Sequence, residues 1–226
     1  MRYTTIFFDL DDTLYQSSTG LWEVIRSRMS KYMAERLGLP AEEIPRLRRS
    51  YYETYGTTLR GLQKHHKVDP DDYLAYVHDI PVETYLEPAP QIRQMLLSLP
   101  QQRWIFTNAD ANHARRVLSV LGLEGCFTGI IDVWAMDFAC KPEPEAYYKA
   151  LELAGEVHPR NCVLLDDSPS NLARAHQMGF TTVLVGPDGP HPAAIFTISN
   201  LLELPKTLPQ LWNGRQAEME VPEDGR

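Results

Sequence analysis

The stretch IFFDLDDT, residues 6–13, joins a short apolar run to a cluster of acidic side chains. The run has the length of a buried strand, and four further runs of similar length follow along the chain. We expect strands at Thr4–Phe8, Arg103–Phe106, Ile130–Val133, Cys162–Leu165 and Thr182–Val185. Helical patterns alternate with these runs through most of the chain. This alternation predicts an α/β fold, in which a Rossmann-like parallel sheet is covered by helices on both faces.

Three stretches between the predicted strands have apolar residues at helical spacing and end at a glycine. In Ala111–Leu121 the apolar side chains recur every three or four residues, and Gly122 then provides a stop. Glu143–Ala154 and Ser168–Met178 are followed by a glycine in the same way. We expect these helices to cover the sheet.

One interval, residues 16–87, contains no convincing strand pattern. Its first part carries an amphipathic stripe of apolar residues that ends near Gly38. We interpret the interval as a helical cap inserted directly after the first strand. The expected organisation is a Rossmann-like core of residues 1–15 and 88–213, a cap of residues 16–87, and a polar tail of residues 214–226.

The composition limits the classes of partner. The 226 residues include 22 Lys and Arg against 30 Asp and Glu, a formal net charge of −8. This balance argues against binding of a nucleic acid polymer, which needs a broad basic surface, although a few local cations suffice for a small anion. No apolar stretch approaches the ~20 residues needed to cross a bilayer, and the acidic cluster after the first run argues against a signal peptide. The three cysteines, Cys126, Cys140 and Cys162, form no disulfide or zinc pattern, so we expect a cytoplasmic protein without a membrane partner.

Polar residues follow three of the predicted strands at the point where each strand ends. In an open parallel sheet, ligands bind outside the carboxyl ends of the strands, so we expect these residues to face one crevice. A lysine after the third predicted strand can reach the same place. The residues concerned are Asp9, Asp11, Thr107, Asn108, Asp166, Asp167 and Lys141.

This collection of side chains suits one kind of chemistry. Carboxylates this close raise one another's pKa unless a cation relieves them, and oxygen ligands suit Mg²⁺, which binds through a few carboxylates together with substrate phosphate. With the metal and Lys141 present, a phosphoryl group can enter, and the Thr107 hydroxyl and backbone N–H groups near Asn108 could hold its oxygens. One carboxylate could act as the nucleophile, and another two residues away could transfer protons. The crevice therefore suits hydrolysis of a phosphate ester, with a small phosphorylated metabolite as the partner.

The ordered set of residues resembles the four motifs of the haloacid dehalogenase-like superfamily. The pattern D-x-D-x-T at residues 9–13 matches the first motif, and the others are matched by Thr107, Lys141 and the pair Asp166-Asp167. The resemblance covers residues 1–15 and 88–186. It implies that Asp9 is the nucleophile, that Asp11 is the general acid/base, and that the phosphoryl group is bound by Thr107, Asn108 and Lys141. It also implies a Mg²⁺ site made by Asp9, the Leu10 carbonyl, Asp11 and Asp167, with Asp166 assisting.

Two finer resemblances narrow the expected function. Dehalogenases of this superfamily lack the second aspartate of the first motif, so the presence of Asp11 points to a phosphatase. The stretch YGTTLRGL, residues 55–62, looks like the helical cap of pyrimidine 5′-nucleotidases. It implies a pyrimidine nucleoside 5′-monophosphate as substrate, with its base or sugar contacted by Tyr55, Thr57, Thr58 and Arg60. His113, just behind the second motif, is expected to be structural or to line the rim.

Other functions remain open at this stage. Within the same superfamily, the substrate could be a sugar phosphate or a broad set of small phosphomonoesters. A different class is a phospho-accepting signalling module without turnover, because receiver domains also carry acidic pairs, a threonine and a lysine on a parallel sheet. However, receivers lack a long helical insertion after the first strand. The sequence does not fix the leaving group, the pathway, the role of the tail or the oligomeric state.

Overall fold

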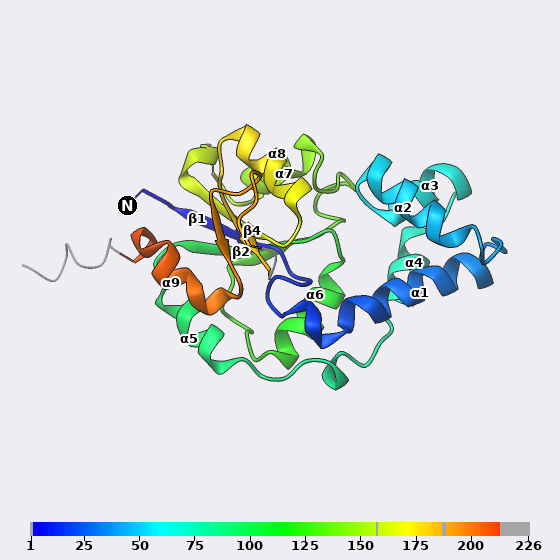
Figure 1. Ribbon diagram of the computed structural model, residues 1–226, viewed down its shortest axis with the longest axis horizontal. Coiled ribbons are helices and arrows are strands. Elements are labelled where there is room, and N and C mark those ends of the chain that lie inside the picture. Colours follow the sequence, from blue (N-terminus) through cyan, green and yellow to red (C-terminus); the bar gives the residue numbers. More distant parts are fainter. Residues whose placement is uncertain (1, 157, 187–188, 213–226) are drawn as a thin grey trace, which may run out of the picture.

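A computed structural model describes residues 2–156, 158–186 and 189–212, so the predicted polar tail of residues 214–226 lies outside the described residues. The described strands form one parallel sheet in the order β3-β2-β1-β4-β5-β6 (Figure 1). The strands are β1 (Thr5–Phe8), β2 (Gln102–Phe106), β3 (Gly129–Ile131), β4 (Cys162–Asp166), β5 (Thr181–Val185) and β6 (Phe196–Ile198). The five predicted strands are therefore confirmed to within two residues at each end.

The sequence pattern did not reveal β6. This strand has only three residues and lies at the edge of the sheet, where two of its side chains are half-buried. A short edge strand needs no apolar run, because only one of its neighbours is another strand. By contrast, β1 lies in the middle, and all four of its residues are buried.

Helices cover both faces of the sheet, as predicted. In β1, Phe7 points into one hydrophobic cluster with α7 and α8, whereas Ile6 and Phe8 point into the cluster that includes α5, α6 and α9. The two groups of helices lie on opposite sides of the strands (Figure 1). Their bounds are α5 (Pro90–Ser98), α6 (Ala111–Val120), α7 (Pro144–Leu153), α8 (Pro169–Met178) and α9 (Leu204–Thr207).

Four helices between β1 and α5 form the cap that the sequence predicts. They are α1 (Leu21–Glu35), α2 (Ile44–Tyr55), α3 (Thr58–His66) and α4 (Pro70–Val77). They lie together beyond the carboxyl ends of the strands (Figure 1) and share a hydrophobic cluster with Tyr32, Met33 and Tyr73 at its centre. Val133 and Cys140 from the loops after β3 join this cluster, so the cap is packed against the core.

The strand register sets the level of the polar loops. Phe8 pairs with Ile105 of β2 on one side and with Leu165 of β4 on the other. Because the three strands are parallel and in register, Asp9 and Asp166, which come next in the chain, end up side by side. None of the described helices has both the length and the apolar character that a membrane span requires.

Candidate active site

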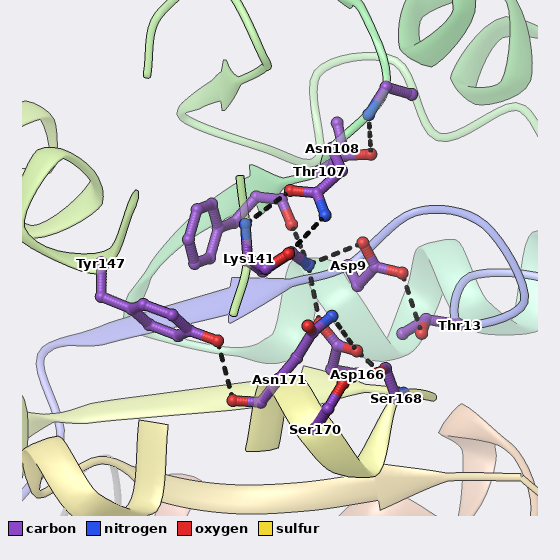
Figure 2. A network of polar contacts seen from close by, with 12 residues as sticks. Asp9, Thr13, Thr107, Asn108, Lys141, Tyr147, Asp166, Ser168, Ser170 and Asn171 are labelled. Atoms are coloured by element: carbon purple, nitrogen blue, oxygen red, sulfur yellow. Dashed lines mark hydrogen bonds and ion pairs between the residues drawn. The ribbon is translucent and has the colours of Figure 1, made fainter. Parts of the chain in front are cut away.

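A buried ammonium group lies at the centre of the polar loops. Lys141 is 1% exposed, and its Nζ donates hydrogen bonds to Asp9 Oδ1 at 2.8 Å, Asp166 Oδ2 at 2.6 Å and the Phe106 carbonyl at 2.7 Å (Figure 2). These partners come from the ends of β1, β4 and β2, respectively. The structure therefore brings four of the predicted segments together at one point.

The charges in this centre depend on one another. Burial alone would lower the pKa of Lys141, but the charges of Asp166 and Asp9 outweigh it and raise the pKa, so the lysine stays protonated. Burial raises the pKa of Asp9, Lys141 opposes the increase, and the nearby charge of Asp166 adds to it. The net effect is a raised pKa at Asp9, and burial is its largest cause.

Both carboxylate oxygens of Asp166 accept hydrogen bonds from the surrounding protein. The residue is 0% exposed, and besides Lys141 it accepts hydrogen bonds from the Ser168 backbone N–H at 2.9 Å and from Asn171 Nδ2 at 3.0 and 3.2 Å. Asn171 is not among the predicted site residues, although its place in the first turn of α8, five residues after Asp166, could have suggested it.

Asn108 fixes the lysine segment through its side chain. Its Nδ2 donates to the Lys141 carbonyl at 2.9 Å, and its Oδ1 accepts from the Lys141 backbone N–H at 2.8 Å. Its own backbone N–H makes no hydrogen bond within the described residues. The Thr107 hydroxyl oxygen accepts from the Ala109 N–H at 3.0 Å, which leaves the hydroxyl hydrogen available to a ligand.

Asp11 lies in a different environment from Asp9. Its Oδ1 accepts hydrogen bonds from the Tyr15 hydroxyl at 2.6 Å and from His113 Nε2 at 2.8 Å. Burial would raise the pKa of Asp11, but the charge and hydrogen bond of His113 and the hydrogen bond of Tyr15 prevail and lower it. The expectation that His113 is structural or lines the rim missed its contact with Asp11. It lies 102 residues further along the chain, so no local pattern could signal the contact.

Three carboxylates are close enough to share a metal ion. One oxygen from each of Asp9, Asp166 and Asp167 lies within 4.8 Å of the others. Surrounding protein atoms displace water from Asp167 and raise its pKa, and the charges of Asp166 and Asp9 raise it further, although the residue is still exposed to solvent. An all-oxygen donor set with crowded negative charge fits Mg²⁺. The Leu10 carbonyl already accepts backbone hydrogen bonds of 3.4 and 3.0 Å within the following turn.

The loop between α2 and α3 packs directly against the lysine segment. Gly56, at φ +81°, leaves no room for a side chain, because a Cβ there would lie 2.9 Å from the Lys141 carbonyl oxygen. The Thr57 hydroxyl lies 3.7 Å from Cys140 Sγ, and Arg60 forms an ion pair with Glu143. The cap is thus in contact with the loop that carries the buried lysine.

The four predicted specificity residues differ in burial and in the polar contacts that their side chains already make. Thr57 accepts a hydrogen bond from the Arg60 N–H at 3.2 Å and caps α3. Thr58 is buried, and the Tyr55 hydroxyl bonds His65 Nε2 at 2.8 Å. Tyr55, Thr57 and Arg60 each have a polar partner of their own, whereas the Thr58 side chain has none within the described residues.

Comparison with known proteins agrees with this geometry. Residues 3–179 match the family model of the haloacid dehalogenase-like hydrolases. The chain belongs to this hydrolase family. The residues that the resemblance matches to the four motifs come at or after the ends of β1, β2, β3 and β4 in this structure, and their roles stay predictions. Phosphate metabolism protein 8 of Saccharomyces cerevisiae is 32% identical over 192 residues, which are 79% of this chain but only 60% of the yeast protein.

Solved structures of other haloacid dehalogenase-like proteins share the fold. The phosphatase of this family from Thermococcus onnurineus aligns with a TM-score of 0.60 at 21% identity, over 90% of this chain and 96% of the other. L-2-haloacid dehalogenase from Xanthobacter autotrophicus, with chloropropionic acid covalently bound, aligns with a TM-score of 0.56 at 19% identity, over 90% and 97%. A phosphatase and a dehalogenase therefore share this fold, so the fold alone does not indicate which of the two reactions a member catalyses.

Proposed function

We propose that this hydrolase is a Mg²⁺-dependent phosphatase that cleaves small phosphomonoesters through an aspartyl-phosphate on Asp9. The observation that supports this best is the pairing of the Asp9 carboxylate with the buried Lys141 ammonium at 2.8 Å. The nearby Asn108 N–H makes no hydrogen bond within the described residues. The name of the yeast relative refers to phosphate metabolism. The covalent adduct in the Xanthobacter dehalogenase is a precedent for covalent chemistry on this fold.

The proposed reaction has two displacements at phosphorus. The Asp9 carboxylate attacks phosphorus, the bond to the ester oxygen breaks, and Asp11 donates a proton to the leaving oxygen. Asp11 then takes a proton from water as that water attacks the aspartyl-phosphate, which releases inorganic phosphate and restores Asp9. Lys141, the Thr107 hydroxyl and the Asn108 N–H would bind the phosphoryl oxygens.

The carboxylate cluster would hold the metal. Asp9 and Asp167 are the proposed ligands, with Asp166 close by and the Leu10 carbonyl and Asp11 retained as further candidates. Bound Mg²⁺ would supply the positive charge that lets a phosphate approach these carboxylates. Two carboxylates in the first motif support a phosphatase over a dehalogenase, because the second can protonate an alkoxide leaving group, whereas a halide needs no proton.

We further propose that the leaving group is a pyrimidine nucleoside that cap residues contact. In this proposal the cap comprises residues 16–87, and the core comprises residues 1–15 and 88–213. Tyr55 and Arg60 are both partly exposed, and the Arg60 guanidinium pairs with Glu143. Because Thr57 caps a helix and Thr58 is buried, these two would act by shaping the cap. Action on a cytoplasmic metabolite remains part of the proposal.

The test is a substrate panel with purified protein and Mg²⁺. Uridine, cytidine, adenosine and guanosine 5′-monophosphates are compared with sugar phosphates by release of inorganic phosphate. Asp9→Asn should reduce turnover by at least about 10³-fold. Asp12→Asn is the matched control, because Asp12 is the adjacent carboxylate, and asparagine tolerates its φ of +57°.

Each part of the proposal can fail separately. Full activity of Asp9→Asn would contradict the covalent route. Equal rates on pyrimidine nucleotides and sugar phosphates would replace the nucleotidase proposal by a broad phosphatase. A stable phosphorylated protein with no turnover would favour the signalling module instead.

A further inference from the structure

His113 is a buried histidine whose polar contact leads into the active site. The residue is 1% exposed, and its Nε2 lies 2.8 Å from Asp11 Oδ1. Its Nδ1 is buried and has no hydrogen-bond partner among the described residues. An apolar side chain would fill this space without the cost of burying a polar ring, so packing does not explain a histidine here.

The position of the His113 ring is fixed by its surroundings. Asp110 caps α6 and accepts the His113 backbone N–H at 3.0 Å, which sets the first turn of the helix. On the cap side the His78 ring stacks on His113, with centroids 4.2 Å apart and planes 14° apart. His78 Nδ1 in turn bonds Asp110 Oδ2 at 2.5 Å. The imidazole therefore lies clamped between its own helix and the residue that follows α4.

This clamp acts on one oxygen of Asp11. Both Tyr15 and His113 donate to Oδ1, whereas Oδ2 receives no hydrogen bond within the described part of the chain. Two donors on one oxygen restrict rotation of the carboxylate, which leaves Oδ2 as the oxygen available to a substrate.

We propose that His113 is a positioning residue, which holds Asp11 Oδ1 so that Oδ2 is presented to the leaving group. The inference rests on the proposed phosphatase function, in which Asp11 transfers protons. In the first displacement, Oδ2 carries the proton of a monoanionic phosphate ester to the ester oxygen as the bond from phosphorus to that oxygen breaks. In the second displacement, Oδ2 takes a proton from the attacking water and returns it to the released phosphate. His78 makes this arrangement depend on the cap, because it follows α4 directly.

The test compares two leaving groups. The alkoxide of an alkyl phosphate needs a proton to depart, but p-nitrophenolate leaves without one. We therefore expect His113→Leu to lower kcat/KM for glycerol phosphate by about 10²-fold. The loss of kcat/KM for p-nitrophenyl phosphate should be no more than about 10-fold. The value of kcat/KM is used because it reports steps up to the departure of the leaving group.

Two further variants separate positioning from packing. His113→Gln retains an N–H donor near the place of Nε2 and should restore most of the loss on glycerol phosphate. Val117→Ala, on the same helix and fully buried, perturbs packing without touching Asp11, and should change both substrates equally. If His113→Leu does not fold, Tyr15→Phe removes the other donor to Oδ1 and should give the same selectivity for the poor leaving group.

The outcomes are distinct. An equal loss on both substrates, or no loss, would overturn the positioning role of His113, and so would a failure of His113→Gln to restore activity. Absence of turnover by the unmodified protein on any phosphate ester would instead refute the proposed function, and the inference would fall with it.

Discussion

The core and the cap contribute to the crevice in different ways. In the core, Asp9 and Asp166 both accept hydrogen bonds from Lys141, and all three residues are buried. On the cap, Tyr55 bonds to a cap histidine and Arg60 to Glu143, and both remain partly exposed.

This contrast determines which substitutions the molecule can tolerate. A buried charge that loses its partner has no water to replace it, so removal of one core charge destabilises the fold by leaving the others unpaired. A partly exposed residue exchanges its partner for water at little cost, so the cap can vary and still fold. If this comparison is right, substitutions in the core should affect stability far more than substitutions at the contact between cap and core.

The largest effect is expected for Lys141→Met. The substitution keeps much of the volume but leaves Asp9 and Asp166 buried without their cation. We expect the free energy of unfolding to fall by about 3–5 kcal/mol, measured by urea denaturation. Lys149→Met is the control, because this exposed lysine also pairs with an aspartate, Asp137, at 2.8 Å. Similar unfolding midpoints for the two variants would contradict the mutual dependence of the core charges.

The next effect concerns Mg²⁺ and needs no substrate. A metal that binds only the folded chain at a hundredfold excess over its Kd should raise the free energy of unfolding by about 2.7 kcal/mol. Asp167→Asn should remove most of that gain, and a chelator should abolish it. Asp137→Asn, which alters an exposed carboxylate outside the cluster, should preserve the gain. Equal stabilisation of both variants would exclude Asp167 as a ligand.

A third effect tests the contact between cap and lysine segment. Gly56 and Gly20 have nearly the same φ, +81° and +80°, but only Gly56 faces a backbone oxygen at 2.9 Å. Gly20→Ala should cost about 1–2 kcal/mol for the left-handed conformation alone. Gly56→Ala should cost more, and it alone should lower kcat/KM, because the Lys141 segment must move. Identical losses of stability with unchanged kinetics would show that the loop after α2 does not support the lysine.

Much of the fold and the core of the site could be predicted from the sequence. Buried parallel strands leave continuous apolar runs, and the polar residue after each run must come out at the same edge of the sheet. Asp9 and Asp166 could therefore be expected to lie close together, and in the structure one oxygen of each lies within 4.8 Å of the other. The edge strand β6 was not predicted, because a strand of three residues, two of them half-buried, leaves no such run.

The contacts that could not be predicted join segments without a shared strand edge. Asn171 and His113 reach the site from the first turns of two helices, and each depends on how that helix is rotated. Helix rotation is set by packing of many side chains, which a pattern in one segment does not contain. The same reasoning explains why Thr58 looked available in the sequence and is buried in the structure.

The smallest effect, and the sharpest test of the cap, is the ion pair between Arg60 and Glu143. Their side chains are 28% and 34% exposed, so a double-mutant cycle of Arg60→Met and Glu143→Gln should give a coupling of about 0.5–1 kcal/mol that weakens with salt. The helical pair Lys31 and Glu35, which is more exposed, should give a smaller coupling.

Kinetics then separate two roles of Arg60. If the arginine only latches the cap, both single substitutions should alter KM for a nucleotide to the same extent, because each breaks the same pair. If it also contacts the leaving group, Arg60→Met should raise KM well beyond Glu143→Gln, and the excess should disappear with p-nitrophenyl phosphate, which lacks a base and a sugar. If KM for p-nitrophenyl phosphate also rises more in Arg60→Met than in Glu143→Gln, the arginine acts on the phosphoryl group itself. That result would contradict the proposal that the core carries out catalysis and the cap only selects the leaving group.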